Sequence, residues 1–298
     1  MRDFDETTIT GAVLASVHGA PDARVRQLSE ALVRHLHAFI REVEPTEAEW
    51  EWGIRFLTET GHLCSDTRQE FILLSDTLGV SMLVDAINHR LPAGATETTV
   101  FGPFYVTPPH YPIGANIKGH LNGCPLFLSG TVRSTDGRPL EGATIDVWHA
   151  DREGFYDLQK LDEHPELAGR GRFYADANGC FHLWSIRPSP YPIPHDGTVG
   201  KMLKAQGRHP FRPEHVHFLI EARGYPKLVT HLFAAGGEYL DSDVVFGVKN
   251  SLVREYMRHS GGTAPDGQAM QGEWYSLHHD FSLAADLSLS SGYGDGWL

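Results

Sequence analysis

The chain has 298 residues, and 25 Lys and Arg residues against 38 Asp and Glu residues give a formal net charge of −13. This charge argues against nucleic-acid binding and against an anionic membrane partner, because both attract clusters of Lys and Arg. The three scattered cysteines, Cys64, Cys124 and Cys180, predict no disulfide framework and a reducing, cytoplasmic location. No signal peptide and no membrane insertion are expected, since apolar runs of the required length are absent from the sequence.

The N-terminal third carries helical patterns. Apolar residues recur at steps of three and four over 25–43, which is the stripe of an amphipathic helix. Pro45 ends this helix, and residues 46–49 (Thr-Glu-Ala-Glu) have the form of a capping box that begins a second one. A third helix is expected over 66–87. We therefore predict a helical N-terminal domain over residues 1–95.

Short runs rich in Val, Ile, Phe and Thr follow, separated by turn sequences such as 135–139 and 177–179. This spacing is typical of a β-sandwich, which we predict over residues 96–298. The fold class is thus mainly β with an N-terminal α part. Two long loops are expected at 157–172 and 188–214, and long loops in a compact domain are often functional.

His215 and His217 stand one residue apart in an apolar run that ends at Ile220. On a β-strand, residues i and i+2 point to the same face, so both imidazoles can bind one metal ion. Histidines also alternate on ordinary solvated strand faces, and the pair alone does not separate the two interpretations. Two upstream tyrosines favour the metal: Tyr156 after the expected strand 143–149, and Tyr191 in a proline-rich segment.

Two phenols and two imidazoles would make a hard, anionic, nitrogen-containing ligand set. Thiolates favour zinc or copper(I), and carboxylates with water favour magnesium or calcium, whereas two phenolates suit a ferric ion. Iron(III) is therefore the expected metal. Zinc is the alternative, because a His-x-His pair with one further ligand also serves it.

Several separated motifs resemble those of the intradiol ring-cleaving dioxygenases, in the same order and with the same spacing. Around the expected metal ligands, the matching segments are Asp146–Asp151 with Gly154–Tyr156, the proline-flanked Tyr191, and Arg212–His217. Outside them, the matching segments are Gln69–Asp76, Val100–Phe104 and Leu240–Val248. The resemblance covers most of the chain, from near residue 20 to near residue 280.

The resemblance implies one Fe(3+) per chain, bound by Tyr156, Tyr191, His215 and His217. It implies a transthyretin-like sandwich as catalytic domain and cleavage by O2 of a small aromatic diol or triol between its two hydroxyl-bearing carbons. By position, Tyr191 is the ligand that leaves the metal and accepts a substrate proton.

Two further residues receive catalytic roles. Arg212 is positioned to enter the same cavity, where a fixed guanidinium can stabilise negative charge that develops during the reaction. His231 stands where many catechol-cleaving relatives carry a glutamine. Its role stays open between a hydrogen bond to a metal ligand and proton transfer.

The expected ring pocket most resembles that of the hydroxyquinol-cleaving branch of the family. The pocket residues are Leu73, Asp76, Val100, Phe101, Gly102, Pro103, Phe104, Ile193, Pro194 and Val245. Hydroxyquinol would give 3-hydroxy-cis,cis-muconate, which tautomerises to maleylacetate. Catechol or chlorocatechol is the alternative substrate, whereas the protocatechuate branch lacks the N-terminal helical part.

Two other expectations follow from the resemblance. The helical domain would pair two subunits into a homodimer, with a phospholipid at the interface. A different class of function also stays open, because sandwiches of this kind occur as non-catalytic binding modules. Colour separates the two, since ferric tyrosinate is wine-red and a binding module is colourless.

Overall fold

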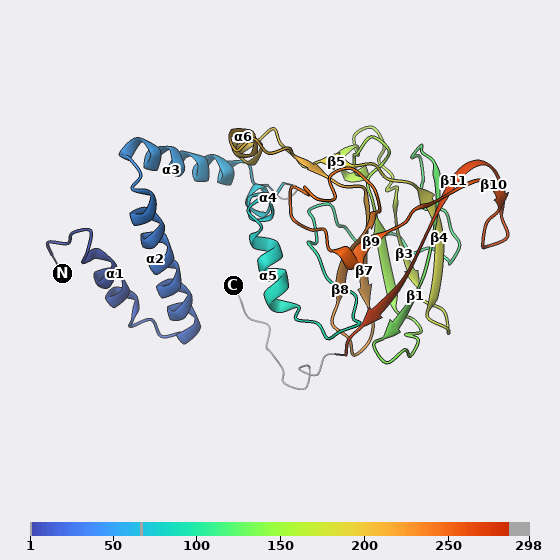
Figure 1. Cartoon of the computed structure of the whole chain (residues 1–298), viewed down its shortest axis with the longest axis horizontal. Helices are drawn as coiled ribbons and strands as arrows, with labels where there is room; N and C mark the ends of the chain where they lie inside the picture. Colours follow the sequence, from blue (N-terminus) through green and yellow to red (C-terminus); the bar gives the residue numbers. More distant parts are fainter. Residues whose placement is uncertain (1, 66–67, 286–298) are drawn as a thin grey trace. The chain divides into compact units, whose positions relative to one another are not determined.

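The computed structural model describes residues 2–65 and 68–285. It divides into two compact units, Met1–Glu59 and Thr60–Leu298 (Figure 1). The domain boundary that the sequence places near residue 95 stays a prediction.

The first unit contains α1 (Ile9–Val17), α2 (Ala23–Val43) and most of α3 (Glu47–His62). The predicted amphipathic helix is confirmed as α2, and Asp22 caps its N-terminus by accepting two backbone N–H groups. The capping box is also confirmed. Thr46 donates its backbone N–H to the Glu49 carboxylate at 2.8 Å, and Glu49 donates its own to the Thr46 hydroxyl at 3.3 Å.

The single helix expected over 66–87 is wrong, because the chain forms two helices there. These are α4 (Glu70–Thr77) and α5 (Val80–Asn88), separated by Gly79. Gly79 has φ 72°, a left-handed conformation that glycine adopts without strain and that ends a right-handed helix. The expected start at Asp66 lies outside the described residues. Among the described helices, none combines the length and apolarity of a membrane span.

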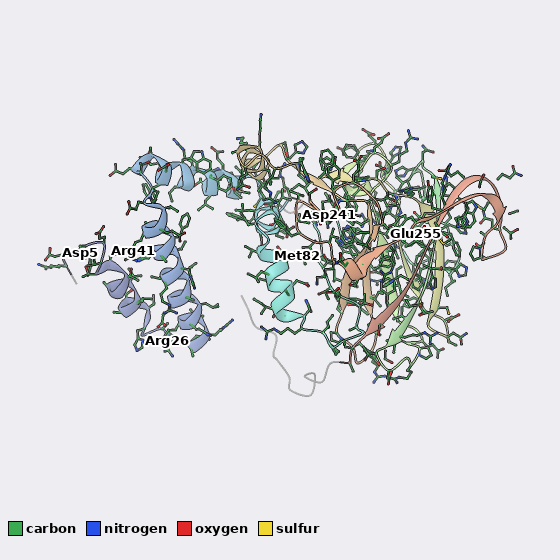
Figure 2. All side chains as sticks on the ribbon, in the orientation of Figure 1. Asp5, Arg26, Arg41, Met82, Asp241 and Glu255 are labelled. Carbon is green, nitrogen blue, oxygen red and sulfur yellow. The ribbon has the colours of Figure 1, made fainter. Side chains whose placement is uncertain are left out.

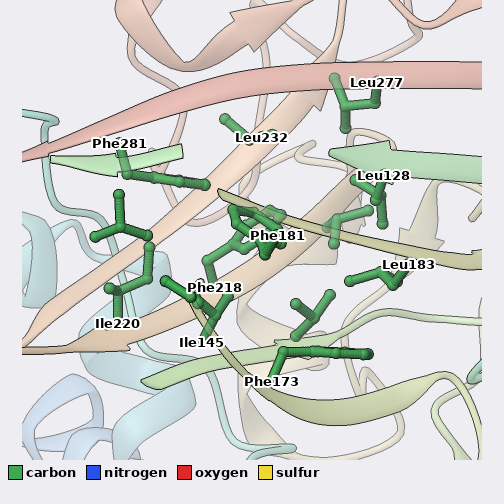
Figure 3. Packing of buried hydrophobic residues seen from close by; sticks show 14 of the residues in the cluster. Leu128, Ile145, Phe173, Phe181, Leu183, Phe218, Ile220, Leu232, Leu277 and Phe281 are labelled. Atoms are coloured by element: carbon green, nitrogen blue, oxygen red, sulfur yellow. The ribbon is translucent and has the colours of Figure 1, made fainter. Parts of the chain in front are cut away.

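Two sheets form the predicted sandwich. The first sheet has the order β10 (Met257–Thr263), β11 (Ala269–Leu283), β1 (Pro125–Ser134) and β4 (Cys180–Ile186). The second has the order β3 (Arg170–Tyr174), β2 (Thr144–Trp148), β7 (His215–Glu221), β8 (Leu228–Ala234) and β9 (Val253–Arg254). Side chains from both sheets meet in one apolar core, in which Phe181 and Phe218 lie near the centre of Figure 3.

The strand β7 shows how this core positions the candidate site. Val216, Phe218 and Ile220 point into the sandwich core. Because side chains alternate along a strand, His215 and His217 point to the opposite face of the five-stranded sheet. There a second buried cluster covers the sheet with residues from α4, the segment around Val100, β5 (Tyr191–Pro192) and α6 (Thr198–Ala205). Met82 of α5, labelled in Figure 2, packs against this cluster.

The two segments expected as long loops are partly regular. A 3-10 helix, Asp157–Gln159, and the start of β3 interrupt residues 157–172. Residues 188–214 contain α6 between β5 and β6 (Phe211–Arg212), and these two strands pair with each other. The prediction of two long loops therefore holds only for the segments between these elements. The pairing sets Tyr191 directly opposite Arg212.

Candidate metal centre

His217 lies in the middle of three adjacent strands. Across the sheet it faces Trp148 of β2 on one side and His231 of β8 on the other. The Trp148 indole stacks on the His217 imidazole, with centroids 4.6 Å apart and planes inclined by 16°. This contact fixes the orientation of the imidazole, because Trp148 is itself fully buried.

A backbone carbonyl selects the tautomer of His215. The Nδ1 atom of His215 lies 2.7 Å from the carbonyl oxygen of Pro213. Only a protonated Nδ1 can donate there, so the lone pair of a neutral His215 is on Nε2. This Nε2 lies 3.1 Å from Nε2 of His217. Metal–nitrogen bonds of about 2.1 Å place neighbouring ligand atoms about 3 Å apart, so the spacing fits two ligands of one ion.

The two tyrosines complete the donor set. The phenol oxygen of Tyr156 lies 2.7 Å from Nε2 of His217, and Tyr156 is fully buried. The ring centroid of Tyr191 lies 5.3 Å from that of Tyr156 and 5.5 Å from that of His215. Gly154 allows this approach, since a Cβ atom there would lie 2.7 Å from Cβ of Tyr191. The structure therefore brings together all four ligands expected from the sequence.

Electrostatics favour a bound cation among these groups. Burial, and then the neighbouring Tyr191, raise the pKa of Tyr156 well above its ordinary value, so this phenol keeps its proton unless a positive charge replaces it. Burial also lowers the pKa of His215 and His217 well below the ordinary value. Neutral imidazoles have lone pairs for a metal. The donor set present thus fits a cation, and phenolate oxygen makes it a hard one.

Arg212 is buried beside the histidines, as its expected role requires. One guanidinium nitrogen, Nη1, lies 3.2 Å from Nε2 of His215, and the other, Nη2, lies 3.4 Å from Nδ1 of His231. Burial lowers the pKa of Arg212, but Asp243 and then Tyr191 raise it by more, and the net shift is upward. The guanidinium therefore stays charged inside the protein.

His231 belongs to the same cluster. Its nearest ligand atom and those of His215 and His217 lie within 4.8 Å of one another. Because a guanidinium can only donate, Nδ1 of His231 accepts from Arg212 and a neutral ring carries its proton on Nε2. This contact joins His231 to Arg212, and both roles that the sequence left open for His231 stay predictions.

Most of the expected pocket residues surround the donors. The buried cluster that contains Tyr156 and Tyr191 also contains Leu73, Val100, Ile193 and Val245, with Phe104 packed against it. The Phe104 ring stacks on Tyr156 with centroids 4.5 Å apart.

The remaining members of the expected pocket differ in their surroundings. A Cβ atom at Gly102 would lie 3.3 Å from the His217 ring, and Phe101 contacts Trp148 edge to face. Pro103 is exposed and Pro194 is half-buried. Asp76 is 6% exposed near the end of α4. Burial raises the pKa of Asp76, and the Ser81 hydroxyl and the charge of Arg212 oppose this shift.

The sequence interpretation missed two residues. Trp148, which orients His217, and Asp243, which forms an ion pair with Arg212 at 3.1 Å, were noted only as parts of longer motifs. A signal existed for Asp243. A buried arginine requires an anionic partner, and the segment Leu240–Val248 offers two aspartates.

Family models match two parts of the chain. A model described as "Catechol dioxygenase N terminus" matches residues 22–96, and one described as "Dioxygenase" matches residues 102–283. The chain belongs to the intradiol dioxygenases. Members of this family use non-haem iron, in agreement with the buried cluster of His215, His217 and His231.

Relatives of this intradiol dioxygenase match it over nearly its full length. A 6-chlorohydroxyquinol 1,2-dioxygenase of Cupriavidus pinatubonensis is 51% identical, covering 96% of this chain and 100% of the relative. A hydroxyquinol 1,2-dioxygenase of Nocardioides simplex is 48% identical, covering 94% and 95%. The crystal structure of hydroxyquinol 1,2-dioxygenase from Pseudomonas putida DLL-E4 matches with a TM-score of 0.88 and 48% identity, covering 94% of this chain and 99% of that one. The predicted fold, a β-sandwich after a helical part, is thereby confirmed.

Proposed function

We propose that this dioxygenase cleaves hydroxyquinol, 1,2,4-trihydroxybenzene, between its adjacent hydroxyl-bearing carbons. O2 is the co-substrate, and the product is 3-hydroxy-cis,cis-muconate, which tautomerises to maleylacetate. The observation that carries the proposal is the similarity, over nearly the whole chain, to enzymes named for hydroxyquinol and chlorohydroxyquinol. The buried donor cluster supports the reaction type.

The proposed cofactor is one Fe(3+) per chain, held by Tyr156, Tyr191, His215 and His217. Two phenolates neutralise two of its three charges, and two neutral imidazoles complete the set. Zinc is the weaker alternative, because a redox-inactive ion cannot supply ferric chemistry. When bound, a ferric ion would withdraw electron density from the substrate diolate and so make its ring carbon reactive toward O2.

The side chains of the site supply proton transfer and charge stabilisation. Binding of the diol as a dianion releases two protons, and we assign the Tyr191 phenolate to accept one of them. Arg212 is buried and permanently charged, so it can stabilise negative charge that develops on the substrate. Leu73, Ile193 and Val245 exclude water from the ring.

Asp76 is proposed to distinguish hydroxyquinol from catechol. It is buried near the end of α4 and close enough to Arg212 to feel its charge. A buried carboxyl group gains most from a hydrogen-bonding partner, and the third hydroxyl of hydroxyquinol offers one. Catechol lacks this hydroxyl and would not supply that hydrogen bond.

The N-terminal helices are proposed to form a homodimer with a bound phospholipid. Along α2 the apolar stripe is exposed, a pattern typical of a surface that a partner covers. The residues of this stripe are Val25, Leu28, Leu32, Leu36, Phe39, Ile40 and Val43. Sedimentation of the purified protein should give twice the chain mass, and Leu32→Asp should shift it to monomer. Lipid extraction followed by mass spectrometry tests for the phospholipid.

One assay tests the proposed function directly. Purified protein is supplied with hydroxyquinol, catechol, 4-chlorocatechol and protocatechuate, while O2 uptake and products are measured. Hydroxyquinol should have the highest kcat/KM and should give maleylacetate. Preference for catechol with formation of cis,cis-muconate would establish the alternative substrate. A colourless protein without turnover would establish a binding module.

A further inference from the structure

The guanidinium of Arg212 has a carboxylate partner that the reaction itself does not require. Nε of Arg212 donates to Oδ1 of Asp243 at 3.1 Å, and Nη2 donates to Oδ2 at 3.2 Å. Both residues are buried, Arg212 being 2% and Asp243 5% exposed. This two-point contact fixes the plane of the guanidinium and leaves Nη1 directed at His215.

The backbone holds Asp243 in turn. Its carboxylate accepts the backbone N–H of Gly247 at 2.9 Å and that of Val245 at 3.4 Å. The same loop contains Phe246 with φ 58°, a left-handed conformation that is strained for a bulky side chain. Such strain persists only where surrounding contacts determine the conformation, and hydrogen bonds to Asp243 are contacts of this kind.

Gly247 packs directly against the contact between Arg212 and Asp243, with no room for a side chain. A Cβ atom at this position would lie 2.9 Å from Nη2 of Arg212 and 3.1 Å from Oδ2 of Asp243. The Gly247 carbonyl also accepts a hydrogen bond from the Thr99 hydroxyl at 2.7 Å. Its φ is not in the left-handed region, so the close approach to Arg212, and not the backbone conformation, favours glycine here.

We propose that Asp243 is a positioning residue that holds Arg212 in the orientation needed for turnover. The proposal rests on the catalytic role assigned to Arg212 above. A flexible guanidinium would have to be ordered during the reaction, whereas one already fixed by a carboxylate stabilises developing charge without that cost. Among the described residues, the Asp243 carboxylate accepts from Arg212 and from the backbone of Val245 and Gly247, not from an expected metal ligand, so it acts through Arg212.

A double-mutant cycle on turnover tests this mechanism. Asp243→Asn keeps the shape of the side chain but removes its charge, and kcat should fall about 10- to 100-fold with KM changed much less. In the Arg212→Ala background, the same substitution should lower kcat by less than about twofold, since there is no guanidinium left to position. Losses that multiply in the double variant would overturn the proposal.

Gly247→Ala gives a second variant in case Asp243→Asn does not fold. It keeps both charges and pushes on the contact between Arg212 and Asp243, and on the Thr99 hydroxyl, which would lie 3.0 Å from the new Cβ atom. It should lower kcat by about tenfold, with iron content unchanged. Wild-type kcat in a folded Gly247→Ala protein would mean that the orientation of Arg212 does not matter.

A matched control separates positioning from general destabilisation. Asp146 is a fully buried carboxylate that pairs with Arg172 and accepts from Tyr105, so its ion pair involves a different arginine from that of Asp243. Asp146→Asn should lower the urea midpoint of unfolding but leave kcat within about threefold. If it lowers kcat as much as Asp243→Asn does, the effect on turnover is one of stability and the proposal fails.

A double-mutant cycle on the free energy of unfolding tests the contact between Asp243 and Arg212 even if the proposed substrate is wrong. The changes in unfolding free energy of Arg212→Ala and Asp243→Asn should be far from additive, because each removes the same contact. Additive changes would refute the proposed contact between Asp243 and Arg212, whichever substrate the wild-type protein cleaves. Absence of diol cleavage by the wild type, together with strong coupling in unfolding, would refute the proposed function alone.

Discussion

The phenol oxygen of Tyr156 lies 2.7 Å from Nε2 of His217, and both side chains are buried. This contact joins the 3-10 segment after β2 to the central strand β7, across 61 positions of sequence. A phenol and an imidazole in such a contact share one proton. A cation that binds both donor atoms replaces this proton. Tyr156 and His217 therefore give the most direct test of the proposed ligand set.

Loss of either partner should remove the metal. Tyr156→Phe and His217→Ala should each reduce bound iron and abolish the visible phenolate band, because Tyr156 supplies an anionic donor and His217 a neutral one. Iron analysis and absorption spectra measure this. Full iron content and colour in both variants would show that other residues bind the metal.

His231→Gln is the control for that experiment. His231 lies in the same histidine cluster but accepts from Arg212 through Nδ1. A glutamine can keep an acceptor there, so iron and colour should persist while kcat changes by less than about tenfold. Loss of iron in this variant would instead make His231 a ligand.

Arg212→Ala should lower turnover by about 100-fold or more while iron and colour remain. The reason is that the guanidinium acts on charge that appears only during the reaction. Arg212→Lys should restore turnover only in part, since an ammonium lacks the planar fork that contacts both His215 and Asp243. Steady-state kinetics with hydroxyquinol measure both effects. A near-normal kcat in the alanine variant would contradict the catalytic role of Arg212.

Asp76→Ala should change substrate preference. The hydrogen bond to the third hydroxyl is expected to contribute about 1.5–3 kcal/mol, so kcat/KM for hydroxyquinol should fall about 10- to 100-fold. Catechol cleavage should be preserved or improved, because catechol has no third hydroxyl to pair with this buried carboxyl group. Parallel losses on both substrates would indicate general damage to the site, and an unchanged ratio would make Asp76 a bystander.

His279 should weaken the fold in acid. Burial and the neighbouring Arg254 lower the pKa of His279 from 6.5 to about 4. The unfolded chain therefore binds the proton first, and the stability gained from a neutral His279 is present above pH 6.5 and lost as the pH falls to about 4. By linkage this loss is about 3 kcal/mol.

The measurement is the urea midpoint of unfolding as a function of pH. His279→Gln keeps an acceptor for Arg254, which donates to Nδ1 of His279 at 3.0 Å, and should flatten the profile between pH 6.5 and 4. His278→Gln is the matched control on the adjacent, exposed side chain and should leave the profile unchanged. Equal acid sensitivity of wild type and His279→Gln would contradict the prediction.

Local physical chemistry was enough to predict several elements from the sequence alone. The apolar stripe of α2, the capping box of α3 and the strand with His215 and His217 depend on spacings of two to four residues, which adjacent side chains impose. The chemistry of the ligand set also followed from residue types, because phenols and imidazoles favour hard ferric iron whatever the fold.

Tertiary structure alone decided what surrounds those residues. The break at Gly79 depends on a backbone angle that the apolar pattern of 66–87 does not reveal. The ion pair between Arg212 and Asp243 spans 31 positions, and the stacking of Trp148 on His217 requires the pairing of β2 with β7. A strand's alternation determines which side chains share a face. Only packing determines which face becomes the core and which distant residues cover the other face. These contacts join segments that are far apart in the sequence, so local spacing does not specify them.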